Sequence, residues 1–184
     1  MRGNSFSRVV ASRLPDRTDL WSAFGAVVFI VFSWSIRGYI FKLPSLLLQF
    51  DLLDLVGVFA YMMSIALVES LIVELLLICA AAILPLYWFR EGFGYKASVV
   101  VFVTAAWIIH FEDIMKYEFP AWSIVIYNIG GLLAILVILI LLFHRVKLLQ
   151  RIMEDFVDRL QVFLYIYPFI GVLSLFIVVL RNLN

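Results

Sequence analysis

The sequence predicts an all-α integral membrane protein, a polytopic helical bundle of about five transmembrane helices. Its mean hydropathy is +1.09 and 65% of its residues are hydrophobic, against roughly 45–50% apolar residues in soluble domains. Charged residues make up only 15% of the chain and gather at the ends of the apolar segments. Lipid must therefore be the main solvent, and we expect a basic amino-terminal segment (1–19) followed by one transmembrane domain (20–184).

Five apolar segments are long enough to cross a hydrocarbon core of about 30 Å, which takes roughly 20 helical residues. Each segment is followed by residues that end a span: Lys42 and Pro44, then 90–92, then Pro120, then Arg145. The predicted spans are 20–41, 54–86, 96–116, 121–143 and 161–181.

The first span follows a stretch that resembles the basic start of a signal peptide. Its apolar run, Trp21–Ile36, ends in bulky residues and has no small-x-small cleavage site. We therefore interpret it as a retained signal anchor, with Thr18 or Asp19 as the helix N-cap.

Two spans have unusual lengths. The second is longer than a membrane needs, so either it tilts or residues 46–55 lie in the outer interface with Asp54 in headgroup water. The third, 96–116, has an uninterrupted apolar stretch of only Ala97–Phe111. A re-entrant or interfacial segment is therefore the alternative there.

The orientation follows from the Lys and Arg residues on alternate loops, because cytoplasmic loops carry an excess of them. With the N-terminus inside, four lie on outer segments: Arg37, Lys42, Lys116 and Arg181. The remaining ten lie on inner segments: Arg2, Arg8, Arg13, Arg17, Arg90, Lys96, Arg145, Lys147, Arg151 and Arg159. This imbalance predicts an N-terminus inside and a C-terminus outside.

An amphipathic interfacial helix is expected at 145–160, before the last span. Apolar residues recur on one helical face, and i,i+4 ion pairs such as Arg151–Asp155 are expected on the other. The polar face could dock a cytoplasmic partner, or the segment could be an elbow whose apolar face packs on the bundle; we favour the elbow. The residues of the polar face are Arg151, Glu154, Asp155, Asp158 and Arg159.

The last span contains Pro168 and Gly171. Proline removes a backbone hydrogen bond inside a helix, and neighbouring helices make such breaks tolerable in membranes. The pair predicts a kink or local unwinding within 161–181.

Two glutamates, Glu69 and Glu74, lie inside the longest apolar run of the chain. A carboxylate in hydrocarbon costs several kcal/mol, about 2.5–3.5 on insertion scales, unless it is paired, solvated or protonated. Five residues correspond to about 140° around a helix, so the two do not form one paired site. Ser70 and Glu74 do share a face. Candidate cations for these acids are Arg37 and His110.

The glutamates allow two interpretations. One is a proton- or cation-binding site in a transport path, which intramembrane acids commonly mark. The other is a protonated glutamate that makes a polar contact with a neighbouring helix or another subunit. If one residue matters more, we expect it to be Glu69, because it lies deeper.

No catalytic or metal-binding constellation is recognisable, and we expect no cofactor. His110 and Asp113 share an i,i+3 spacing, but two ligands at a membrane boundary do not make a metal site. The sequence has no GxSxG or HExxH motif, no cysteine beside a base and no glycine-rich phosphate loop. With a net charge of +1, nothing indicates nucleic acid as a partner.

These observations predict a non-enzymatic integral membrane subunit or accessory protein. The expected partners are the lipid bilayer and either another membrane protein or further copies of the chain. The alternative is a small proton- or cation-coupled transporter that uses Glu69 and Glu74, and less favoured still is a membrane enzyme with an unrecognised site. The chain has no Asn-x-Ser/Thr sequon and no targeting tag, so a bacterial plasma membrane is the expected location.

Overall fold

The computed structural model describes residues 15–83, 92–115 and 122–183, apart from the side chains of 113–115 and 144. In these residues the chain forms five α-helices and no strand, and all five helices are long and apolar enough to cross a membrane. The predicted all-α polytopic fold is therefore confirmed. The helices are α2 (Arg17–Leu47), α3 (Leu52–Ile83), α5 (Phe93–Met115), α6 (Trp122–Arg145) and α7 (Lys147–Leu183).

Some sequence features fall outside this description. They are residues 1–14 of the basic segment, the predicted span end at Arg90, the separator Pro120 and the side chain of Asp113.

Helix α2 begins one turn earlier than expected. Its N-cap is Asp16, whose extended backbone (φ −66°, ψ 153°) and side chain accepting from the Arg17 N–H fit a capping residue. The prediction of Thr18 or Asp19 as the cap is therefore wrong. Asp19 lies inside the first turn, and its carboxylate accepts hydrogen bonds from the backbone N–H groups of Phe93 and Gly94 at the start of α5.

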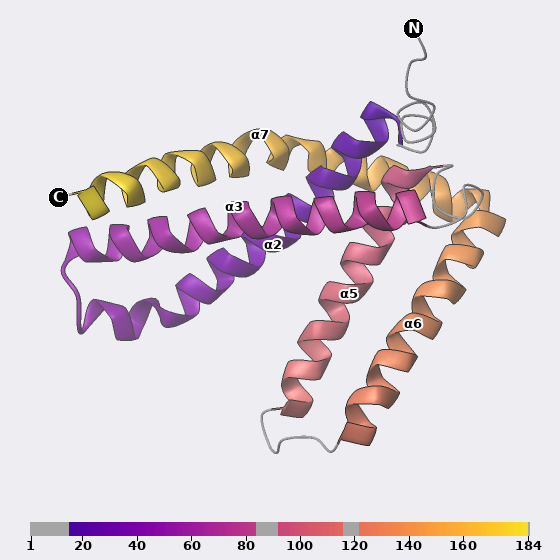
Figure 1. Ribbon diagram of the computed structural model, residues 1–184, viewed down its shortest axis with the longest axis horizontal. Coiled ribbons are helices and arrows are strands. Elements are labelled where there is room, and N and C mark those ends of the chain that lie inside the picture. The colour runs from indigo at the N-terminus through magenta and orange to yellow at the C-terminus, as the bar shows by residue number, and fades with distance from the viewer. Residues whose placement is uncertain (1–14, 84–91, 116–121, 184) are drawn as a thin grey trace, which may run out of the picture.

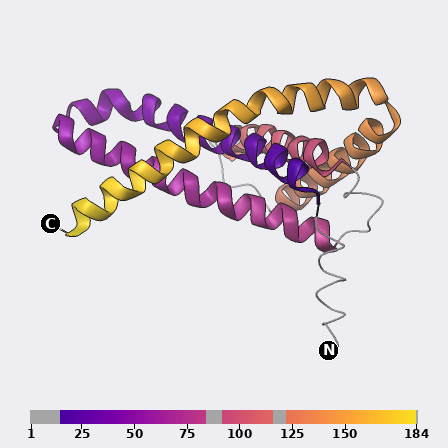
Figure 2. The ribbon, with the colours of Figure 1, turned by 90° about the horizontal axis from the view of Figure 1, so that it is seen from above.

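Two helices are longer than expected. Helix α2 includes Pro44, which lies in its last turn, where a missing N–H removes one hydrogen bond only; nearby, the Ser45 hydroxyl donates to the Lys42 carbonyl at 2.9 Å. Helix α7 joins the expected interfacial helix and the last span into one helix of 37 residues. It remains helical through Pro168, and Figure 2 shows it as a curved helix rather than an unwound one.

Helices α2, α3 and α7 pack side by side as a three-helix unit (Figures 1 and 2). The rings of Phe32 and Tyr167 stack with centroids 5.2 Å apart. A Cβ on Gly171 would lie 2.9 Å from the Leu67 Cβ, so α7 approaches α3 as closely as a glycine permits. The buried core of this unit comprises Val28, Phe32, Met63, Ala66 and Leu67.

A second cluster joins α2 and the C-terminal part of α3 to the first half of α5. It gathers where the amino termini of α2 and α5 meet, which we call the Asp19 end; the opposite end of the three-helix unit is the Arg181 end. The buried residues of the cluster are Ala23, Val27, Leu77, Ala81, Phe93, Ala97 and Val101.

Away from this cluster, the hairpin of α5 and α6 leans away from the three-helix unit, as Figure 1 shows plainly. None of the described side chains of α6 is buried. Helix α5 runs without interruption over 23 residues, and its segment Phe93–Glu112 is long and apolar enough to cross a membrane.

Packing at Gly171 gives a first prediction. Gly171→Ala should lower the free energy of unfolding by about 1–3 kcal/mol, because its Cβ would meet Leu67 and Phe32 at 2.9 and 3.0 Å. The matched control is Gly130→Ala on α6, where no atom lies within 4 Å, and it should be neutral or slightly stabilising. Thermal unfolding in detergent measures both; equal effects of the two changes would contradict the packing described here.

Candidate functional site

The two intramembrane glutamates lie in different surroundings. Glu69 is exposed on α3, whereas Glu74 is 8% exposed. Neither Glu74 oxygen has a hydrogen-bond partner among the described residues. Ser70 shares the face of Glu74, but its hydroxyl donates to the Ala66 carbonyl at 2.7 Å, so its proton is already used.

The course of the hairpin explains this difference. Leu77 and Ala81 are covered by α2 and α5 at the Asp19 end, and Glu74 lies within one turn of Leu77. Glu69 lies five residues, about one and a half turns, farther toward the Arg181 end of α3. Five residues of helix thus separate a covered carboxyl group from an uncovered one.

The expected cations lie elsewhere. The Arg37 guanidinium lies 5.1 Å from the centre of the Trp34 ring, a cation–π contact within α2. The His110 ring packs edge-on against Trp107 in α5, with centroids 5.9 Å apart. Within the described residues neither forms an ion pair with Glu69 or Glu74, so the structure does not bring this predicted set together.

Glu69 lines a small cleft of about 160 Å³. The other walls are apolar: Ile30, Val31 and Trp34 come from α2, and Ala105 and Ile108 come from α5. A carboxyl group in such a cleft has no polar side chain beside it, so the cleft can hold a cation or a hydrogen-bond donor that comes from outside the described chain.

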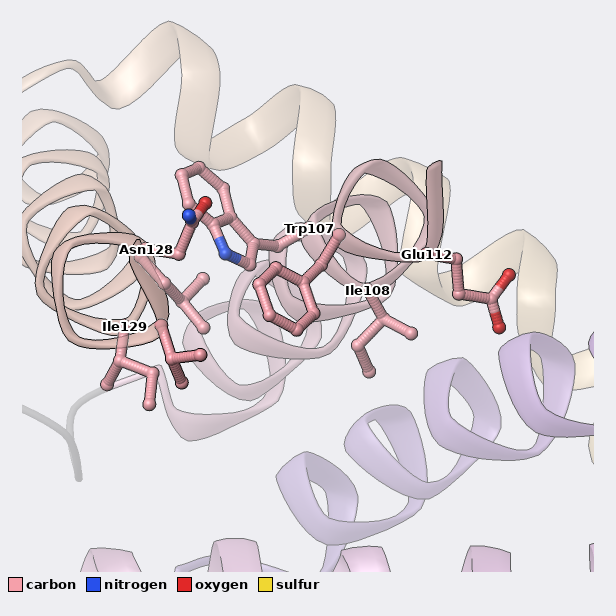
Figure 3. Close-up of a pocket in the computed structure, with 8 residues that line it drawn as sticks. Trp107, Ile108, Glu112, Asn128 and Ile129 are labelled. Atoms are coloured by element: carbon pink, nitrogen blue, oxygen red, sulfur yellow. The ribbon is translucent and has the colours of Figure 1, made fainter. Parts of the chain in front are cut away.

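A larger cavity of about 490 Å³ lies between α5 and α6 (Figure 3). The indole of Trp107 extends toward α6. A Cβ added to Gly131 would lie 3.4 Å from the indole ring, so the glycine leaves room for it. Asn128 donates to the Ile124 carbonyl of its own helix at 2.9 Å, and the Glu112 carboxylate points away from Asn128. The lining is therefore almost wholly apolar and suits hydrocarbon rather than a polar substrate.

A polar cavity of about 240 Å³ lies at the Asp19 end. Asp19 shares it with Glu154 and Asp158 of α7, and the Gln161 side chain donates to Ser22 (3.1 Å) and to Asp158 (3.2 Å). These contacts tie the starts of α2 and α5 to α7. Lys96 lies nearby in the sequence and is 1% exposed, although the sequence analysis counted it among loop cations.

The polar face of α7 has the exposure that was predicted but different contacts. Its five charged residues are exposed, and Val157 and Leu160 of the apolar face are buried, but Ile152 and Phe156 of that face are 56% and 44% exposed. The expected Arg151–Asp155 pair is not among the ion pairs of the described residues. Instead, Gln150 donates to Glu154 at 2.8 Å. The exposed face is solvated, which is the cheaper state for surface charges.

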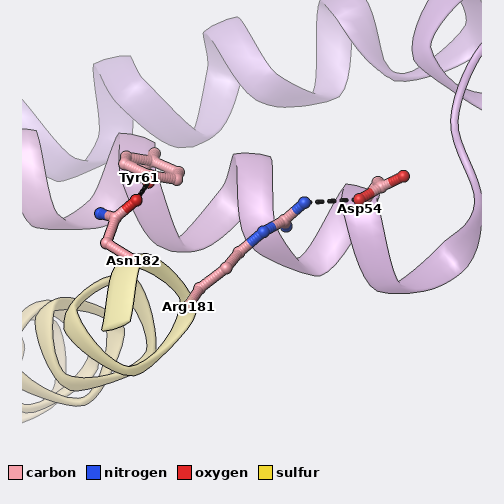
Figure 4. A network of polar contacts seen from close by, with 4 residues as sticks. All are labelled: Asp54, Tyr61, Arg181 and Asn182. Carbon is pink, nitrogen blue, oxygen red and sulfur yellow. Dashed lines mark hydrogen bonds and ion pairs between the residues drawn. The ribbon is translucent and has the colours of Figure 1, made fainter. Parts of the chain in front are cut away.

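At the Arg181 end, α7 is joined to α3 by two polar contacts (Figure 4). Arg181 pairs with Asp54 at 2.5 Å, and the Tyr61 hydroxyl donates to the Asn182 carbonyl oxygen at 2.9 Å. Arg181 reaches Asp54 across Gly57, where a Cβ would overlap the guanidinium. The sequence analysis did not identify this pair, although the predicted topology places both residues on the same side of the membrane.

No family model, curated protein or solved structure shows significant similarity to this chain.

Removing the carboxyl group of Glu74 should stabilise the isolated protein. Glu74→Leu is expected to raise the free energy of unfolding by about 1–3 kcal/mol, because it removes a buried polar group that has no partner in the described chain. Glu69→Leu, at an exposed position, should change it by less than about 0.5 kcal/mol. Unfolding in detergent compares the two; a large loss of stability in Glu74→Leu would mean that the carboxyl group is satisfied in the folded protein.

The contact between Asp54 and Arg181 can be tested with a double-mutant cycle. Asp54→Asn and Arg181→Gln should each cost about 0.2–1 kcal/mol, since the side chains are 43% and 46% exposed, and the double variant should cost no more than either one. Gly57→Ala should cost a similar amount because its Cβ displaces the guanidinium. Fully additive losses would show that the two residues do not interact.

Proposed function

We propose that this protein is a non-enzymatic integral membrane subunit that assembles with another membrane protein. The observation that carries the proposal is α6, a spanning helix of which no described side chain is buried. Together with α5 it leaves the three-helix unit at an angle, so the five helices do not close into one compact bundle (Figure 1). The exposed side chains of α6 offer a surface to a further membrane helix.

The distribution of polar residues supports a role without catalysis. The polar contacts at the Asp19 end join α2, α5 and α7, and those at the Arg181 end join α3 and α7. Both sets hold helices together. Glu69 and Glu74 lie apart from each other and from these contacts.

A proton- or cation-coupled transporter is the second candidate. The observation that favours it is Glu74, a buried carboxyl group without a partner in the described chain, since such groups commonly mark ion paths. Glu69, however, opens to a cleft whose lining does not include Glu74.

We further propose that the protein lies in a plasma membrane of bacterial type. The distribution of Lys and Arg predicts that its N-terminus is inside and its C-terminus outside.

Native purification tests the proposal. The tagged chain, extracted from its own membrane in a mild detergent, should elute with a second membrane protein in a fixed ratio, as mass spectrometry would show. A photoreactive residue in place of Ile126 or Ile138, both exposed on α6, should form an adduct with that protein. A pure monomer or homo-oligomer would contradict the subunit proposal, and ion flux into vesicles, compared with Glu74→Gln, would then test transport.

A further inference from the structure

The exposed face of α3 carries a single charge. Ile65, Val68, Ile72 and Leu76 are all about half exposed or more and recur at helical spacing with Glu69 among them. A face of this kind is suited to contact lipid or another helix, except at Glu69. Because hydrocarbon offers a carboxylate no hydrogen bond, Glu69 requires a partner that the apolar residues around it do not supply.

The cleft beside Glu69, of about 160 Å³, has room for one side chain of another helix. Its far wall on α5 presents Ala105, a small residue that lets a backbone approach closely, and Ile108, which is 52% exposed. Because α5 leans away from α3, the cleft lies where the two helices have diverged (Figure 1). A helix lying along α3 would cover the exposed apolar residues and Glu69 together.

Among the described residues no cation forms an ion pair with Glu69. Trp34 of α2 lines the cleft with Glu69, and Arg37, three residues farther along α2, is the cation nearest to the cleft in sequence. Arg37 also stacks on Trp34. None of the other described cations lines this cleft; they are Arg17, Lys42, Lys96, His110, Arg145, Lys147, Arg151, Arg159 and Arg181.

We propose that Glu69 is the docking point for a transmembrane helix of a second protein, which lies along the exposed face of α3 and carries a Lys or Arg whose side chain enters the cleft beside Glu69. This inference rests on the proposed function and specifies the partner's chemistry and its place. Charge complementarity selects the occupant: an uncompensated carboxylate and a lone cation are each costly in hydrocarbon, and the cost falls when they pair.

Photocrosslinking in the native complex locates the partner. Photoreactive residues at Ile72, three residues from Glu69 on the exposed face of α3, and at Ile108, which lines the cleft, should each form an adduct with an apolar segment of the partner that contains a Lys or Arg. Leu173 of α7, 52% exposed, is the control position and should give no such adduct. An adduct only with a second copy of this chain, or only from Leu173, would overturn the proposal.

Charge variants test the role of Glu69 itself. Glu69→Gln and Glu69→Lys should each reduce the partner recovered per chain by at least about tenfold, since one member of a desolvated charge pair is lost. Glu112→Gln, which removes a carboxylate from α5 outside this cleft, is the matched control and should leave recovery unchanged. Exchanging the charges, with Glu69→Lys here and the partner's cation changed to Glu, should restore assembly.

The outcomes separate this inference from the proposed function. If the unaltered protein elutes with a partner and Glu69→Gln binds it equally well, the docking point is wrong but the subunit proposal stands. If the unaltered protein elutes without any partner, both fail. Because Glu69 is exposed, its variants should elute and unfold like the unaltered chain, so a loss of partner would not result from misfolding.

Discussion

The close approach of α7 to α2 and α3 is the contact on which the rest of the arrangement depends. Apolar side chains gain little by leaving lipid for one another, so membrane helices associate through tight packing and a few polar contacts. Gly25 lets α2 approach the backbone of α7 at Gln161, where the added Cβ would lie 3.6 Å from the Cα, and Gly171 lets α7 approach α3 at Leu67. These two glycines make one compact unit of three helices.

The arrangement of these three helices determines where α5 and α6 can pack. Helix α2 contacts α3 and α7 along one part of its surface and α5 along another, through Ala23 and Val27. The first turn of α5 is fixed there by Asp19, which accepts hydrogen bonds from its backbone N–H groups and satisfies donors that every helix start leaves free. Helix α6 packs against the second cluster through Ile140, but none of its described side chains is buried.

Much of the fold could be predicted from the sequence, because apolar length alone decides which segments cross a membrane. The tertiary contacts could not. Asp19 looked like the cap of its own helix, but it caps α5, since Asp16 precedes the first turn. The pair formed by Asp54 and Arg181 joins residues 127 positions apart, and it depends on the gap at Gly57, which has no signature in sequence. Hydropathy identified both glutamates as unusual, but it could not distinguish a covered side chain from an exposed one.

The difference in exposure between Glu69 and Glu74 results from the way in which α5 separates from α3. Two helices that meet at one end and separate toward the other bury side chains near the contact and expose those beyond it. Glu74 lies within a turn of Leu77, in the buried cluster at the Asp19 end, whereas Glu69 lies where α5 no longer covers α3. The same divergence leaves the Glu69 carboxyl group facing an apolar cleft, and hydrocarbon cannot solvate that group. The exposure of Glu69 and the burial of Glu74 are therefore two results of one arrangement of helices.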